Sequence, residues 1–470
     1  MSAFTLLSAL ILVPATWAAY GEAPVVALSR NHSDATLPFW QGYTYCQGGL
    51  SMQRDGPTTA HNHFRSHCRA TGNLAASTKC YHGQAAGHVG NSSARIFSQL
   101  ILCRHRHGAR APAFSKIPGD DTEWYQCGSP VEFTFMNQGN VLSPGRSPYM
   151  KEQVVINGAF NQTLWQGNCD VGELTSLGSH RMHEVGRILR ETYVDQLHFL
   201  PECMDSSFQI SHTYIWRTRM SVENLMAGMY PIQYRGLRQT LTMHVKPSVI
   251  EVMISNPTAC PALASLTAVW TKSPEYAASL APYSALQTKL VTAYNTSGVA
   301  GYNTTQTLYD TASASYCHGL GLKGNLTGGD IETLVIPGTA SYHGLWRTFA
   351  QAEQAKALGV GPWLIEILAS FSDLSTKLQI YSAHDASLDM FLGVVADPDL
   401  PWPPFSSSVE IELWQHEREG LVVRMYYEGL IVPAHPQLDC SFEACPLATL
   451  EAFMRRYILD DYPAACAVTA

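Results

Sequence analysis

The run from Ile96 to Pro112 constrains this chain most, because a mainly apolar strand leads directly into a cluster of cations. Residues 96–103 are rich in apolar and β-branched side chains, a pattern that predicts a buried strand. Beyond it, Arg106 and Arg110 bracket His107 within five residues. Guanidinium groups match phosphate oxygens, and neighbouring positive charges favour a neutral, nucleophilic imidazole. The stretch predicts a phosphate site at the end of a buried strand; the alternative is a basic surface turn that happens to contain histidines.

Two further strand-to-helix junctions carry residues suited to the same chemistry. Arg217 ends a predicted strand over 208–216 and precedes an amphipathic helix, whose N-terminus favours anions. Taken alone, it could equally be an ordinary surface arginine. A second short strand ends at His384 and Asp385. An aspartate there is most often a helix N-cap, but beside a histidine it could protonate a departing alkoxide. Because ligands bind at the carboxyl ends of strands in open α/β sheets, we expect all three junctions to meet.

The order of the predicted elements favours an α/β fold. We expect a three-layer α/β/α sandwich with a mostly parallel mixed sheet and an inserted, mainly helical cap subdomain. The core comprises residues 96–239 and 346–466, and the cap comprises residues 240–345, where Ala, Thr, Ser, Tyr, Gly and Pro dominate. Residues 19–95 form an irregular arm that contains Cys and His. The His spacings in this arm match no standard zinc pattern, so we expect disulfides there rather than a metal.

Several features predict a secreted protein or one in the lysosomal or endomembrane lumen. Residues 1–18 resemble a signal peptide, and no second apolar run is long enough to span a bilayer. Twelve cysteines are many for a reduced cytosolic protein. The candidate N-glycosylation sites are Asn31, Asn91, Asn161, Asn295, Asn303 and Asn325. The net charge is −8 with no dense Lys/Arg block, which argues against nucleic acid or an anionic membrane as partner.

The three junctions together resemble the histidine acid phosphatase family, the acid phosphatase and phytase branch of the histidine phosphatase superfamily. The matching motifs are RHGARAP at 106–112, Arg217 with Thr218 and Ser221, and SAHD at 382–385. The resemblance extends over residues 96–466. The motifs CDVGELT at 169–175, ELWQ at 412–415 and CPL at 445–447 are most similar to phosphoxylose phosphatase and lysosomal-type acid phosphatases. Ala109 departs from the pattern, because many acid phosphatases have an acidic residue there.

The resemblance implies a role for each motif residue. His107 is the nucleophile that becomes phosphohistidine, and Asp385 is the general acid. Four residues bind the phosphate oxygens: Arg106, Arg110, Arg217 and His384. The arginines would carry out the charge stabilisation that Mg²⁺ supplies elsewhere, so we expect neither a metal nor another cofactor. Because Asp385 must be protonated to act, the resemblance also implies an acidic pH optimum.

Other functional classes fit the sequence less well. A zinc hydrolase motif HExxH and a serine hydrolase motif GxSxG are both absent. A cytosolic phosphomutase of the same superfamily would lack the signal peptide and the glycosylation sites. A catalytically inactive binding module would usually lose the nucleophile or the acid, and this chain has both His107 and Asp385. The segments 113–169 and 240–345 have no basic surplus, which favours small, singly phosphorylated substrates over phytate.

Only some cysteine pairings can be predicted. Cys440 and Cys445 are close enough in sequence to close a small loop, and the resemblance implies a bond between Cys260 and Cys466. Cys103 lies within the predicted core strand and is expected to be a buried free thiol. The sequence carries no signal for the oligomeric state.

Overall fold

The computed structural model describes Cys46 and residues 98–128, 131–132, 136–137, 140–141, 149–150, 158–160, 162–235, 241–302, 304–373, 375–416 and 418–467. All of them belong to one compact unit, which begins at Tyr43. The predicted signal peptide and nearly all of the predicted arm lie outside the described residues.

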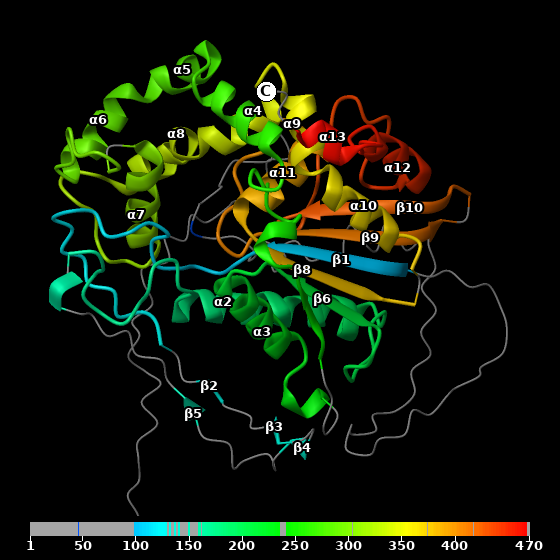
Figure 1. Cartoon of the computed structure of the whole chain (residues 1–470). Helices are drawn as coiled ribbons and strands as arrows, with labels where there is room; N and C mark the ends of the chain where they lie inside the picture. Colours follow the sequence, from blue (N-terminus) through cyan, green and yellow to red (C-terminus); the bar gives the residue numbers. More distant parts are fainter. Residues whose placement is uncertain are drawn as a thin grey trace, which may run out of the picture. The chain divides into compact units, whose positions relative to one another are not determined.

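An eight-stranded mixed sheet forms the centre of this unit (Figure 1). The strand order is β11-β10-β9-β1-β8-β6-β7, and β12 pairs with β10. The mutually parallel strands are β1 (Ser98–Arg106), β8 (Leu378–Ala383), β6 (Phe208–His212) and β7 (Met243–Val245). The antiparallel continuation consists of β9 (Ser408–His416), β10 (Gly420–Tyr427), β11 (Leu430–Ile431) and β12 (Cys445–Pro446). Two small antiparallel ladders lie outside this sheet: β2 (Val131–Glu132) with β5 (Tyr149–Met150), and β3 (Met136–Asn137) with β4 (Asn140–Val141).

Helices cover both faces of the sheet, which confirms the predicted α/β fold. On one face, α2 (Ser176–Arg190) and α3 (Trp216–Met229) share an apolar core with β1, β6 and β8. A π-helical turn, η3 (Glu191–Gln196), continues α2. On the other face lie α10 (Gly361–Ser370) and α11 (Asp385–Val395), where the Arg104 guanidinium lies 4.3 Å from the Phe391 ring centre. Alternate residues of β1 therefore contact opposite helical layers.

Strand β1 is longer than the apolar run that predicts it, because it continues through Arg104 and His105 to Arg106. All three added side chains are buried. Aromatic rings surround the Arg104 guanidinium, which offsets part of the free-energy cost of burying its charge. Only the residues from Arg106 onward reach the carboxyl edge of the sheet.

The chain between β7 and β8 is helical and extends beside the sandwich (Figure 1). Its helices are α4 (Pro261–Thr271), α5 (Pro274–Leu280), α6 (Ser284–Ala293), α7 (Thr305–Cys317), α8 (Gly328–Arg347) and α9 (Ala352–Gly359), followed by α10. Helix α8 begins with a capping box made by Thr327 and Asp330. After β12 come α12 (Leu447–Arg455) and α13 (Tyr462–Cys466).

Four disulfides join pairs of described residues: Cys46–Cys317, Cys127–Cys169 and Cys260–Cys466 connect distant parts of the unit, and Cys440–Cys445 closes a short loop. Cys103 is a buried free thiol in β1. Within the part of the chain that the structure describes, no helix has both the length and the apolar character needed to cross a bilayer.

Candidate active site

The three strand-to-helix junctions meet at the carboxyl edge of the parallel strands. Arg106 pairs with Ala383 across β1 and β8, and His212 pairs with Ser382 across β6 and β8. The residues that follow these strands are therefore neighbours in space. The rings of His107 and His384 lie 5.3 Å apart, centre to centre. All six residues predicted for catalysis or phosphate binding belong to this one cluster.

His107 is held in one tautomer by the backbone. Its Nδ1 lies 2.8 Å from the Gly108 carbonyl oxygen, so Nδ1 carries the proton and donates it. In the neutral ring, Nε2 then bears the lone pair. Burial lowers the pKa of His107 well below its usual value, and the positive charges of Arg217, Arg106 and Arg110 lower it further. The arrangement presents a neutral imidazole with a nucleophilic Nε2.

Close backbone packing positions the motif loop (residues 107–112). The Gly108 N–H donates to Ser221 Oγ at 3.1 Å, and Ser221 in turn donates to the Arg217 carbonyl at 2.7 Å. A Cβ added to Gly108 would meet the Gly178 carbonyl oxygen at 2.4 Å, and one added to Gly178 would meet the Ala109 oxygen at 2.1 Å. Only glycine allows the loop to approach the first turn of α2 this closely.

Arg106 and Arg110 are fixed by contacts on several sides. Arg106 donates through Nη1 to the Pro403 carbonyl at 2.7 Å, and its guanidinium carbon lies 3.9 Å from the Phe405 ring centre. Arg110 lies 5.5 Å from the same ring and pairs with Asp310 of α7 at 2.7 Å. Neither Phe405 nor Asp310 belongs to a motif, and no spacing in the sequence points to them.

Arg217 lies in the first turn of α3 and faces His384. Its Nη2 is 3.4 Å from Nδ1 of His384, and His384 Nε2 is 3.0 Å from the Thr213 hydroxyl. Since an arginine can only donate, Nδ1 accepts and the proton of a neutral His384 resides on Nε2. Burial, followed by the charge of Arg110, lowers the pKa of Arg217 to about 9. Burial also lowers the pKa of His384 well below its usual value, and Arg217 lowers it further.

Asp385 is the first residue of α11 and lies beside Arg106. Its Oδ2 is 2.9 Å from Arg106 Nη2, and its Oδ1 accepts the Ala386 N–H at 2.9 Å. Burial alone would raise the pKa of Asp385, but the charges of Arg106 and Arg110 outweigh it and hold this pKa below its usual value. In the absence of substrate, the carboxyl group is therefore ionised and paired.

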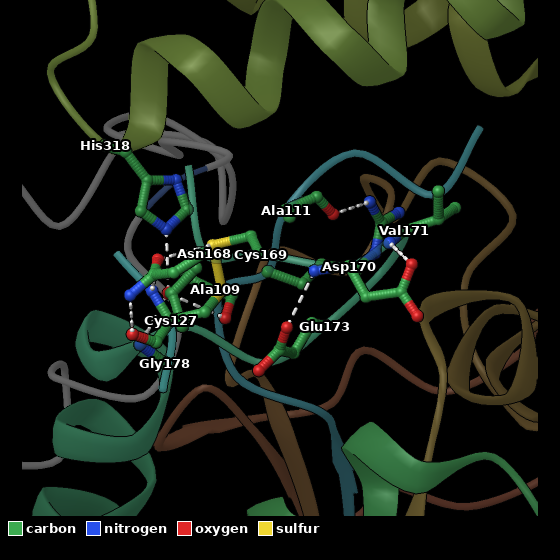
Figure 2. The surroundings of a disulfide bond; sticks show 12 residues. Ala109, Ala111, Cys127, Asn168, Cys169, Asp170, Val171, Glu173, Gly178 and His318 are labelled. Atoms are coloured by element: carbon green, nitrogen blue, oxygen red, sulfur yellow. Dashed lines mark hydrogen bonds between the residues drawn. A yellow bond between two sulfur atoms is a disulfide. The ribbon is translucent and has the colours of Figure 1, made fainter. Parts of the chain in front are cut away.

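A disulfide and several hydrogen bonds around residues 168–178 hold the motif loop in place (Figure 2). The Cys127–Cys169 disulfide adjoins Asn168, whose side chain bonds both the N–H and the carbonyl of Cys127. Ala111 donates to the Glu173 carbonyl at 2.9 Å. From the end of α7, His318 Nε2 lies 2.8 Å from the Thr175 hydroxyl. These contacts join the loop to α2 and to the helical segment.

The other predicted sites are distributed as follows. Asn295 and Asn325 are exposed, whereas Asn31, Asn91, Asn161 and Asn303 lie outside the described residues. The two candidate cysteine pairs, Cys440–Cys445 and Cys260–Cys466, are bonded. Among the residues that the structure describes, no three His, Cys, Asp or Glu side chains are grouped to hold a metal ion.

Comparisons with known proteins agree with this geometry. The family model described as "Histidine phosphatase superfamily (branch 2)" matches residues 103–315, a range that includes His107 and all three arginines. Counting factor 60 of Dictyostelium discoideum is 25% identical over 383 residues, covering 78% of this chain and 88% of that protein. Lysophosphatidic acid phosphatase type 6 of Homo sapiens is 26% identical over 389 residues, covering 79% of this chain and 86% of that protein.

A solved structure extends the likeness of the fold across both halves of the core. The apo form of Hafnia alvei phytase aligns with a TM-score of 0.51 and 15% identity, covering 81% of this chain and 100% of that chain. At this identity the match concerns the fold alone. Family, relatives and fold agree with the motifs. The chain therefore contains a domain of branch 2 of the histidine phosphatase superfamily and is a phosphomonoester hydrolase.

Proposed function

We propose that the chain hydrolyses phosphate monoesters through a phosphohistidine intermediate on His107, with Asp385 as the general acid. The observation that carries this proposal is the neutral imidazole of His107 among three arginines and a second histidine, with its proton on Nδ1. Nε2 attacks phosphorus while the ester oxygen leaves, and water later cleaves the phosphorus–nitrogen bond to release phosphate.

Charge stabilisation comes from Arg106, Arg110, Arg217 and His384. The guanidinium donors of the three arginines would surround the non-bridging oxygens of the transferred group, where negative charge must be stabilised in the transition state. His384 would join them once its Nε2–H, which donates to the Thr213 hydroxyl in the free enzyme, is directed to the substrate. Because Arg106 and Arg110 are already fixed by contacts with a carbonyl, a carboxylate and an aromatic ring, these two side chains need little reorganisation on binding. We propose that this arrangement makes a metal unnecessary.

Asp385 would protonate the leaving oxygen. Its carboxyl group is paired with Arg106 before substrate binds, and a phosphate dianion would compete with it for that guanidinium. Transfer of a proton from Asp385 to the departing alkoxide leaves a carboxylate, which can later accept a proton from the attacking water.

We propose that the enzyme acts in the secretory or lysosomal lumen or outside the cell. Four disulfides among the described residues support an oxidising compartment. The predicted signal peptide and the two exposed glycosylation candidates, Asn295 and Asn325, also support a lumenal or extracellular location. Residues 240–345 would form a cap subdomain whose α7 contacts the motif loop through Asp310. The residue after α7, His318, contacts Thr175 at the start of α2.

For the substrate, we propose a small monoester whose alcohol carries an apolar group. Two exposed apolar side chains, Tyr214 and Trp216, lie at the β6–α3 junction just before Arg217, and Tyr214 shares a cavity lining with the exposed Val249. A cavity of about 280 Å³ lies between Tyr214 and residues 248–258. The human relative is named for a lysophosphatidic acid, a monoester of this kind. Polyanionic phytate would find little basic surface here.

Trapping the covalent intermediate tests the proposal. After rapid mixing with a ³²P-labelled monoester and denaturation in base, we expect one acid-labile, base-stable label on a peptide that contains His107. His107→Ala should remove both the label and turnover without changing the melting temperature by much. The exposed α2 residue His180 provides the matched control, since His180→Ala should retain both. Turnover should also persist after dialysis against EDTA. Activity of His107→Ala above a few per cent of wild type would refute the assignment of the nucleophile.

A further inference from the structure

Asp310 holds one of the phosphate-binding arginines from outside the motif. It lies in the middle of α7, in the helical segment between β7 and β8. Its Oδ1 accepts from Arg110 Nη2 at 2.7 Å, and its Oδ2 lies 3.4 Å from Nη1. The same Oδ2 accepts the Ala113 backbone N–H at 2.7 Å. One carboxylate thus binds both the side chain of Arg110 and the backbone just beyond the motif.

This contact is well suited to fixing the direction in which the Arg110 guanidinium points. A two-point guanidinium–carboxylate pair sets the plane of the guanidinium as well as its position. Arg110 Nη1 also donates to the Ala111 carbonyl at 3.1 Å, and Phe405 packs near the guanidinium carbon. The side chains of Arg110 and Asp310 are only 7% and 12% exposed, so water screens their interaction weakly.

The pairing of Arg110 differs in kind from that of Arg106. The partner of Arg106 is Asp385, which sits at the start of α11 and has chemistry to perform. The partner of Arg110 comes from a helix that supplies no other residue to the phosphate cluster, and it also binds the loop backbone. The contacts of Asp310 therefore suit a residue that holds Arg110 and the loop in place, whereas those of Asp385 suit a residue that takes part in the reaction.

We propose that Asp310 is a positioning residue: it orients Arg110 toward the transferring phosphoryl group and makes this orientation depend on the docking of α7. The proposal rests on the function proposed above. Asp310 acts through Arg110 and has no contact with the phosphate in its own right.

The proposal predicts a separation of kcat from KM. Without the Asp310 charge, Arg110 still attracts a phosphate dianion, and the site gains one net positive charge, so KM should change by less than about threefold. The guanidinium is no longer fixed for the transition state, and misplacement of such a group typically lowers the rate on the order of 10- to 100-fold. Asp310→Asn, which keeps the volume of the side chain, should therefore lower kcat by that factor.

A double-mutant cycle separates this role from general support of the fold. If Asp310 acts through Arg110, adding Asp310→Asn to Arg110→Lys should lower kcat further by less than about threefold. Asp330→Asn is the matched control, because Asp330 pairs with Lys289 at 2.6 Å and caps α8 in the same helical segment. It should lower the melting temperature without lowering kcat. Should Asp310→Asn fail to fold, Asp310→Glu, which keeps the charge but displaces it, carries the same test.

Three outcomes would overturn the proposal: kcat within about threefold of wild type, an equal loss in the wild-type and Arg110→Lys backgrounds, or a loss confined to KM. These outcomes leave the proposed function intact as long as wild-type protein still forms phosphohistidine. Absence of that intermediate would instead refute the proposed function itself.

Discussion

The Asp385 carboxylate forms an ion pair of 2.9 Å with the Arg106 guanidinium, so the proposed acid is bound to a proposed phosphate ligand. The side chain of Arg106 is fully buried, which makes this pairing strong enough to control protonation. A phosphate dianion that binds the same arginines would cancel the charge that keeps Asp385 ionised. The substrate would therefore help to protonate the acid that acts on it.

This relationship predicts different pH profiles for free and bound enzyme. The pKa of Asp385 is lowered in the free enzyme, so its protonated fraction disappears at low pH. In the complex, neutralised arginines should let this pKa rise, and the protonated acid should persist to higher pH. The alkaline limb of kcat, which reports the complex, should lie at higher pH than that of kcat/KM, which reports the free enzyme. Steady-state kinetics with an alkyl phosphate would measure both limbs, and coincident limbs would contradict this account.

The acid role also predicts a dependence on the leaving group. Asp385→Asn removes the proton donor while it preserves the shape of the side chain. Turnover of sugar or alkyl phosphates, whose alkoxides need a proton, should fall about 100-fold or more. Turnover of p-nitrophenyl phosphate should fall far less, because its phenolate leaves without much help. Equal losses on both substrates would contradict the role of Asp385 as acid.

The motif residues could be predicted because each lies at or shortly after the carboxyl end of a strand: Arg106 ends β1, His384 follows β8, and Arg217 lies in the first turn of the helix after β6. Parallel strands bring their carboxyl ends to one edge, so Arg106, Arg217 and His384 must be neighbours once the strands pair as they do. The α/β fold follows from the same alternation of strands and helices. Asp310 could not be predicted in this way. It is a single acid in a polar helix, and its meeting with Arg110 depends on how α7 docks, which no local pattern encodes.

The close approach of the motif loop to α2 predicts a selective loss of activity. Gly178→Ala would push a methyl group against the Ala109 carbonyl and displace the loop. Gly186→Ala is the matched control, because its Cβ would meet the Leu225 carbonyl oxygen at 1.9 Å where α2 packs on α3. Each should cost about 1–3 kcal/mol of stability. Only Gly178→Ala should lower kcat per folded molecule, as active-site titration with labelled phosphate would measure. Equal specific activities would indicate that the loop tolerates displacement.

The exposed apolar side chains beside Arg217 predict a preference among substrates. Trp216 is 51% exposed in the first turn of α3. Trp216→Ala should raise KM for a monomeric lysophosphatidate about 10-fold, because contact with a chain of a few methylene groups contributes on the order of 1–2 kcal/mol. KM for glycerol 3-phosphate should stay unchanged, since it has no such chain. An equal rise for both substrates would argue against an apolar subsite. The comparison uses lysophosphatidate below its critical micelle concentration.

Neutral histidines in the interior set a limit on stability in acid. Burial lowers the pKa of His105 to about 3, while an unfolded histidine titrates near 6.5. Since the folded state binds fewer protons, the free energy of unfolding falls as pH drops below about 6.5, by about 1.4 kcal/mol per pH unit for this one residue. The loss should reach about 2 kcal/mol at pH 5, within the acidic range in which Asp385 would work. His105→Leu, which cannot titrate, should flatten the pH dependence measured by urea unfolding, whereas the exposed-site control His180→Leu should not. An unchanged slope in His105→Leu would mean that this histidine is already protonated when folded.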